Sequence, residues 1–172
     1  ADFLNKLDAI DKPITVIFYG DHLPGAYTTA AADEGNSVDL HETDYFIWSN
    51  KASGSSGNKL SAAESTYTSP NFLMEEAAAH MNAKVTPYLA FLTTLHSKVA
   101  ALEPPVVNVI QRWKRIPSGQ ALYLDSQGNL IDLKKADKET KQLLADYKLI
   151  QYDITAGKQY LRNTDFMTYP KK

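Results

Sequence analysis

The chain has 172 residues, of which 44% are hydrophobic and 22% are charged, a composition typical of a globular domain with its own core. Lysine and arginine number 18 and aspartate and glutamate 20, so the net charge is −2 and no basic stripe indicates nucleic acid or a membrane surface. Cysteine is absent, which excludes disulfides, thiolate nucleophiles and zinc–thiolate sites, so any metal must be held by oxygen and imidazole ligands.

The first fifty residues predict one helix end and two strands. Apolar residues at helical spacing predict a helix over residues 2–10, and an apolar run predicts a strand over Ile14–Tyr19. This run does not alternate strictly, so we expect both of its faces to be covered, as in a parallel sheet flanked by helices. Small and polar residues predict a long loop over 23–43, and a second apolar strand follows at Asp44–Ser49.

The rest of the chain predicts mainly helices. Ser69 before Pro70 and Thr86 before Pro87 each have the pattern of an N-cap followed by proline at the first helical position. Residues 121–133 predict two short strands joined at a turn over 126–129, and residues 138–161 predict one or two terminal helices.

Asp21 and His22 stand side by side where the first predicted strand ends. In open α/β sheets ligands bind beyond the carboxyl ends of the strands, and Gly20 permits a bend that turns both side chains toward one ion. A carboxylate with an imidazole suits zinc, manganese or magnesium better than calcium. On spacing alone the alternative stays open that Asp21 caps the following turn and His22 is an ordinary loop histidine.

The other histidines are weaker candidates. If the two strands are neighbours, we expect His41 at the far end of the second strand from the Gly-Asp-His turn, unless the intervening loop folds back. His80 and His96 lie in predicted helices, where we expect surface or boundary positions.

Four segments occur in an order that resembles one family: "VIFYGDHLPG" (16–25), "HETDYFIWSN" (41–50), "YTSPNFL" (67–73) and "YKLIQYDITAGKQYL" (147–161). Together they resemble the lipoteichoic acid synthase-like phosphoglycerol transferases of Gram-positive bacteria, a branch of the sulfatase and alkaline phosphatase superfamily. The resemblance covers nearly the whole chain. It implies an α/β fold in which residues 1–172 form the C-terminal part of an alkaline phosphatase/sulfatase-like sandwich, with a small terminal β-hairpin and helices and with the N-terminal half missing.

The resemblance also implies a metal site. Asp21 and His22 would be two ligands of a divalent ion, most often manganese, with magnesium or zinc as alternatives. The threonine or serine nucleophile and the remaining ligands are expected upstream, so we expect this fragment alone to be inactive. The resembled enzymes carry a serine a few residues after the turn, whereas residues 23–27 contain none. Tyr27, within that stretch, and His41 are the candidate substrate contacts.

By resemblance, the parent protein would be an enzyme anchored by N-terminal transmembrane helices on the extracellular side of a Gram-positive membrane. Its substrate would be a phosphate ester of a cell-envelope glycan or glycolipid, and its further partner the missing half of the domain, with no nucleic acid involved. Two alternatives remain: a sulfatase that hydrolyses sulfate esters, and a non-catalytic cell-surface module of the same fold.

Overall fold

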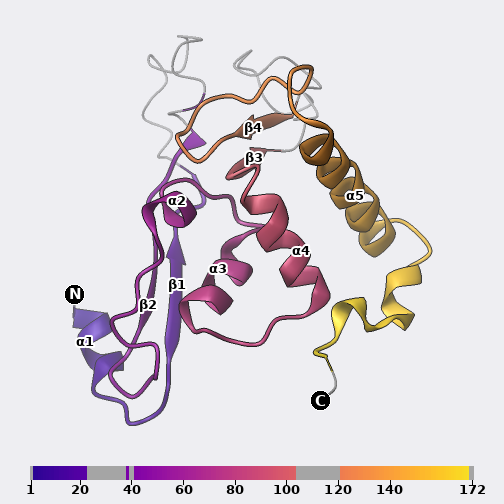
Figure 1. The fold of residues 1–172 in the computed structure, drawn as a ribbon. Helices are drawn as coiled ribbons and strands as arrows, with labels where there is room; N and C mark the ends of the chain where they lie inside the picture. Colours follow the sequence, from indigo (N-terminus) through magenta and orange to yellow (C-terminus); the bar gives the residue numbers. More distant parts are fainter. Residues whose placement is uncertain (1, 23–37, 39–40, 104–120, 171–172) are drawn as a thin grey trace. The chain divides into compact units, whose positions relative to one another are not determined.

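The computed structural model describes residues 2–22, 38, 41–103 and 121–170. The chain divides into two compact units: unit 1 is Ala1–Gly57 with Glu103–Leu122, and unit 2 is Asn58–Leu102 with Tyr123–Lys172. Figure 1 labels the helices and strands. Helices and two two-stranded sheets make up the described residues, so the expected α/β class is confirmed at this level.

Unit 1 is built on two paired strands. After helix α1 (Asp2–Asp8), strand β1 (Thr15–Tyr19) pairs antiparallel with strand β2 (Tyr45–Ser49), in a register from Thr15 opposite Ser49 to Tyr19 opposite Tyr45. Both strands and the helix lie where the sequence predicts them.

The faces of this ribbon differ from the expectation. Phe18 stacks on its cross-strand neighbour Phe46 with ring centroids 5.1 Å apart, yet Phe18 is 56% and Tyr19 50% exposed. The expectation that both faces of this strand are covered is therefore wrong at its carboxyl end, and the expected parallel sheet is wrong for this pair, which is antiparallel. Cross-strand aromatic pairing stabilises such a ribbon without full burial. An apolar run in the sequence is therefore compatible with a partly exposed ribbon as well as with a buried strand.

Asn50, directly after β2, hydrogen-bonds the segment that leads into β1. Its side chain is fully buried, and its amide nitrogen donates to the carbonyl oxygens of Leu7, Ile10 and Lys12 at 3.2, 3.0 and 2.9 Å. Its side-chain oxygen accepts from the backbone N–H of Ile14 at 3.0 Å. A buried amide with all of these bonds made holds the chain ahead of β1 in one conformation.

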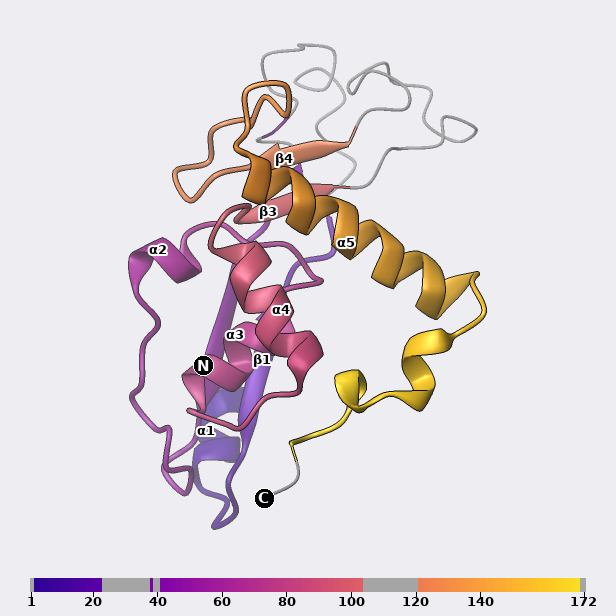
Figure 2. The same ribbon diagram turned by 45° about the vertical axis from the view of Figure 1, so that its right-hand side comes forward.

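Unit 2 is mainly helical. Its helices are α2 (Ala62–Ser65), α3 (Leu73–His80), α4 (Pro87–His96) and α5 (Lys138–Thr155), followed by the 3₁₀ turns η4 (Tyr160–Asn163) and η5 (Asp165–Met167). Figure 2 shows the two 3₁₀ turns following α5 in yellow. Among the described residues, no helix has the length and apolar character needed to cross a bilayer.

The two predicted helix starts have different outcomes. Thr86 is confirmed as the N-cap of α4, because its hydroxyl accepts from the backbone N–H of Leu89 at 3.2 Å. Ser69 is not an N-cap, since α3 begins later, after Phe72. The Ser69 hydroxyl instead accepts from the backbone N–H of Leu102 at 3.1 Å and donates to Asn71 at 2.7 Å. Tertiary contact has thus replaced the local capping role.

The core of unit 2 is a cluster of four buried side chains, Phe72, Leu92, Leu95 and Val99. Packed against it are apolar residues from α4, α5 and the strands, among them Tyr88, Leu102, Tyr123 and Leu144. This core holds α3 and α4 together at the place where their polar side chains also meet.

The predicted hairpin is confirmed at its turn. Strand β4 (Leu122–Leu124) leads into the turn, where Asp125 accepts from the backbone N–H groups of Gln127 and Asn129 and Gly128 has φ +81°. The second arm of the hairpin is a single bridge from Leu130 to Leu124, and β4 pairs instead with strand β3 (Ala101–Glu103).

Candidate functional site

Asp21 and His22 follow the carboxyl end of β1. The last ladder contact at this end runs from the backbone N–H of Gly20 to the carbonyl oxygen of Asp44 at 3.1 Å. Beyond it, Asp21 Oδ2 and His22 Nε2 lie 3.5 Å apart, with side chains 83% and 75% exposed. Asp21 Oδ1 accepts from the backbone N–H of His22 at 2.9 Å, which orients this carboxylate toward the imidazole.

Gly20 has a different role from the one expected. A Cβ at this position would lie 2.8 Å from the Cβ of Thr43, closer than side chains approach. The Thr43 hydroxyl donates to the Gly20 carbonyl at 2.8 Å, so its side chain is held against the glycine. Gly20 is therefore needed for space rather than for an unusual backbone bend, and the contact fixes the base from which Asp21 and His22 project.

His41 lies in a segment that the structure places near the Gly-Asp-His turn. Because β2 runs antiparallel to β1, its first residue, Tyr45, is opposite the last residue of β1, Tyr19. The expectation that His41 lies at the far end of β2 is therefore wrong: its segment enters the ribbon at the end where β1 stops. His41 Nδ1 lies 3.2 Å from Glu103 Oε1, with both side chains about a third exposed.

The predicted substrate contact Tyr27 lies outside the described residues. Within unit 1 the structure describes two imidazole–carboxylate pairs, Asp21–His22 and His41–Glu103.

The Asp21–His22 spacing fits two ligands of one ion. Oxygen and nitrogen ligands lie about 2.0–2.2 Å from a metal such as zinc, so two of them at a tetrahedral or octahedral angle are roughly 3–3.5 Å apart. The 3.5 Å between Asp21 Oδ2 and His22 Nε2 agrees with this. Two exposed ligands alone compete poorly with water, so a tight site needs further donors.

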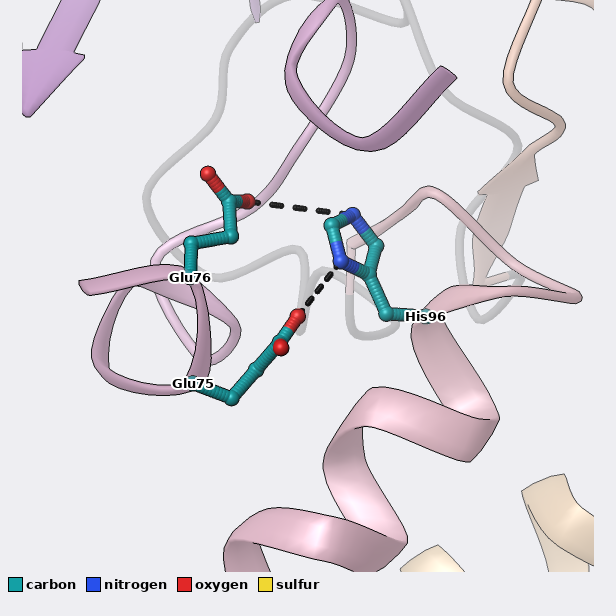
Figure 3. Close-up of side chains that lie close together, drawn as sticks. All are labelled: Glu75, Glu76 and His96. Atoms are coloured by element: carbon teal, nitrogen blue, oxygen red, sulfur yellow. Dashed lines mark hydrogen bonds and ion pairs between the residues drawn. The ribbon is translucent and has the colours of Figure 1, made fainter. Parts of the chain in front are cut away.

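Unit 2 contains a second group of side chains with ligand chemistry, and this group is buried (Figure 3). Glu75 and Glu76 from α3 and His96 from the end of α4 are 3%, 1% and 8% exposed, and one ligand atom from each lies within 4.8 Å of the other two. His96 Nδ1 is 2.6 Å from Glu75 Oε1, and His96 Nε2 is 3.8 Å from Glu76 Oε1. Figure 3 shows the imidazole between the two carboxylates.

The surroundings hold this imidazole in place. Its ring stacks on Phe72 with centroids 4.5 Å apart, and the carbonyl oxygen of Tyr67 is 3.4 Å from Nε2. Thr93 donates to the second oxygen of Glu75 at 3.0 Å. Burial lowers the pKa of His96, but the hydrogen bond to Glu75 and the charges of both glutamates raise it by more, so its pKa lies above the ordinary value.

Sequence reasoning missed this group. The surface or boundary positions expected for His80 and His96 are wrong, because both are buried. A signal was present: His96 follows Leu92 by four residues and so continues the core stripe of α4. Polar residues at core positions indicate a paired cluster, and only the fold shows which partners they have.

The search of curated proteins found no match to the chain, and the search of solved structures found none either. Residues 1–83 match the family model described as Sulfatase. The matched segment contains β1, the Asp21–His22 pair and β2. This match supports a relationship of the chain to the sulfatase and alkaline phosphatase superfamily, whose chemistry is that of sulfate or phosphate esters.

Proposed function

We propose that the chain is the C-terminal part of a metal-dependent phosphoglycerol transferase that acts on a cell-envelope polymer or glycolipid outside the cell. The observation that carries the proposal is the pair Asp21–His22, with ligand atoms 3.5 Å apart directly beyond β1, inside the segment that matches the Sulfatase model. In this proposal the nucleophile, the remaining metal ligands and the N-terminal membrane anchor belong to residues that precede Ala1.

In the proposed mechanism, Asp21 and His22 hold a divalent ion, manganese in preference to magnesium or zinc. When bound, such an ion neutralises charge on the transferred phosphoryl group and activates the nucleophile. The bond from the His22 backbone N–H keeps Asp21 Oδ1 occupied and leaves Oδ2 on the imidazole side. The close contact between Gly20 and Thr43 keeps both ligands on a fixed base.

His41 has a proposed role at the substrate. Its Nδ1 lies 3.2 Å from Glu103 Oε1, and this contact orients the ring. An imidazole N–H in the segment that enters the ribbon beside the Gly-Asp-His turn suits a phosphate oxygen of the incoming ester. Tyr27, in the intervening segment, is the second proposed substrate contact.

The match of residues 1–83 to the Sulfatase family model favours a second candidate, a sulfatase. The two functions differ in the nucleophile: a threonine or serine upstream supports the transferase, and a Cys-x-Pro-x-Arg motif supports the sulfatase. A longer protein with neither would be a non-catalytic surface module.

The test uses the protein with its preceding residues, reconstituted in vesicles with manganese. We expect release of diacylglycerol from a fluorescent lipid with a phosphoglycerol headgroup, and no hydrolysis of p-nitrophenyl sulfate. Residues 1–172 alone should turn over neither p-nitrophenyl phosphate nor p-nitrophenyl sulfate, because two ligands and no nucleophile cannot start the reaction. Steady turnover by residues 1–172 would place the catalytic apparatus elsewhere in the chain.

A further inference from the structure

The buried group on α3 and α4 has the donor set of a metal site. Glu75, Glu76 and His96 supply carboxylate oxygens and imidazole nitrogens within 4.8 Å of one another. All three side chains are at least nine-tenths buried. Zinc is bound in proteins by these two ligand types, whereas magnesium and calcium prefer oxygen ligands alone.

The imidazole is oriented as a metal-binding histidine is. Its Nδ1 is 2.6 Å from Glu75 Oε1, and Glu75 is itself held by Thr93 at 3.0 Å. A carboxylate on one ring nitrogen holds a proton there, so the other nitrogen is the one that binds an ion once its own proton is lost, the arrangement found around most ligating histidines. In His96 that other nitrogen is Nε2, on the side of Glu76.

Two oxygen atoms that can act as ligands lie close to Nε2. Glu76 Oε1 is 3.8 Å and the carbonyl oxygen of Tyr67 is 3.4 Å from Nε2. Ligands of a tetrahedral zinc ion are about 3.3–3.6 Å apart, so a shift of a few tenths of an ångström brings Glu76 to that spacing.

The carboxylates of this group also suit a cation. Divalent ions such as zinc are held in proteins by carboxylate oxygens and imidazole nitrogens, and this group offers both away from water. Such an ion would connect α3, the end of α4 and the chain at Tyr67.

We propose that Glu76, His96 and the Tyr67 carbonyl oxygen bind a structural zinc ion in unit 2, with Glu75 as the positioning residue for His96. The proposal is independent of the Asp21–His22 site, and its test is arranged so that either can fail without the other.

The test uses protein in which Asp21→Asn and His22→Gln remove the first pair, stripped of metal with a chelator and titrated with zinc chloride in a calorimeter. We expect one equivalent to bind. Adding Glu76→Gln, which keeps the size of the side chain, should weaken binding at least a hundredfold. Adding Glu75→Gln should weaken it about tenfold to a hundredfold while one equivalent still binds. The matched control is Glu139→Gln, an exposed glutamate of α5 paired with Lys98, which should leave binding unchanged.

A second measurement keeps the test decisive if Glu76→Gln does not fold. Cobalt(II) added to the Asp21→Asn, His22→Gln protein should give the intense visible absorption of a tetrahedral site with nitrogen and oxygen ligands. No zinc uptake, uptake that Glu76→Gln leaves unchanged, or a weak octahedral cobalt spectrum would each overturn the proposal.

Discussion

Unit 1 and unit 2 each pair carboxylate with imidazole, in opposite environments. Asp21 and His22 are 83% and 75% exposed with ligand atoms 3.5 Å apart, whereas Glu75, Glu76 and His96 are almost fully buried. In water an ion pair at this distance contributes about 0–1 kcal/mol, so the first pair adds little to folding. In the buried group, removal of the imidazole leaves buried carboxylate charge without that counter-charge, which is costly away from water.

The difference in burial suggests a way to distinguish residues that act on a ligand from residues that stabilise the fold. An exposed pair on a fixed base is available to a ligand at almost no cost in stability. A buried group contributes to the packing of α3 against α4, so its removal should lower the free energy of unfolding of unit 2. The following variants test this separation, in order of expected effect.

The largest effect is expected on turnover. In the longer protein with its nucleophile, Asp21→Ala or His22→Ala should lower kcat about a thousandfold or more, because a metal stabilises the developing charge by several kcal/mol and each ~1.4 kcal/mol is tenfold. The matched control is Asp2→Ala, whose side chain is also 83% exposed. Near-normal turnover of either variant would move the metal site elsewhere.

The buried group should instead govern stability. With chelator present, His96→Ala should lower the free energy of unfolding by about 3–5 kcal/mol, because it leaves two buried carboxylates without their imidazole. His22→Ala should change it by less than about 0.5 kcal/mol, as an exposed substitution does. Urea denaturation measures both, and equal losses in the two variants would remove the distinction between the sites.

The contact between Gly20 and Thr43, next to the exposed pair, should also affect the free energy of unfolding. Gly20→Ala places a Cβ 2.8 Å from Thr43 Cβ, so we expect a loss of about 1–3 kcal/mol from overpacking. Thr43→Gly in the same protein removes the clash and should recover part of the loss despite the added backbone freedom. Additive losses in the double variant would show that the close contact is not the cause.

The smallest effect is expected at Asp137, an exposed carboxylate whose main contact is a helix cap and which also lies 3.9 Å from Lys98 Nζ. Asp137 caps α5 by accepting from the backbone N–H of Thr140 at 2.6 Å, and that bond lowers its pKa. The pKa of Asp137 is lower in the folded than in the unfolded protein. Its charge therefore stabilises the fold at pH values above the ordinary aspartate pKa of about 3.9, and this stabilisation is lost as the pH falls through the lowered pKa.

Asp137→Asn retains the capping oxygen and lacks the charge. Thermal melts of the two proteins between about pH 6 and pH 2 should therefore converge toward the acid end. A difference in Tm that stays constant across this range would assign the effect to geometry rather than to charge.

Sequence patterns predicted individual helices, strands and turns better than they predicted which segments contact one another. Thr86–Pro87 and the turn at Gly128 were readable because the residues that make the contact are close in sequence. Ser69 was misread because its hydroxyl bonds the backbone of Leu102, far along the chain. The antiparallel pairing of β1 with β2, which brings the His41 segment to the end of β1, depends on strand order, and an apolar run does not encode that order.

The same division holds for the candidate sites. Asp21 and His22 are adjacent in sequence, so their proximity needs no fold to bring it about. The group around His96 joins residues about twenty positions apart in sequence. The packing of α3 against α4 brings them together, so the group is visible only in the structure. Long-range polar contacts of this kind have no sequence period, which is why the sequence predicts a surface or boundary position for His96.

The central claim is that Asp21 and His22 bind the metal of an ester-transfer centre. The most direct measurement is the anomalous scattering of manganese in crystals of the protein that includes the residues preceding Ala1. The account predicts a manganese peak about 2.0–2.2 Å from Asp21 Oδ2 and His22 Nε2. A manganese peak elsewhere, with Asp21 and His22 facing only water, would contradict it.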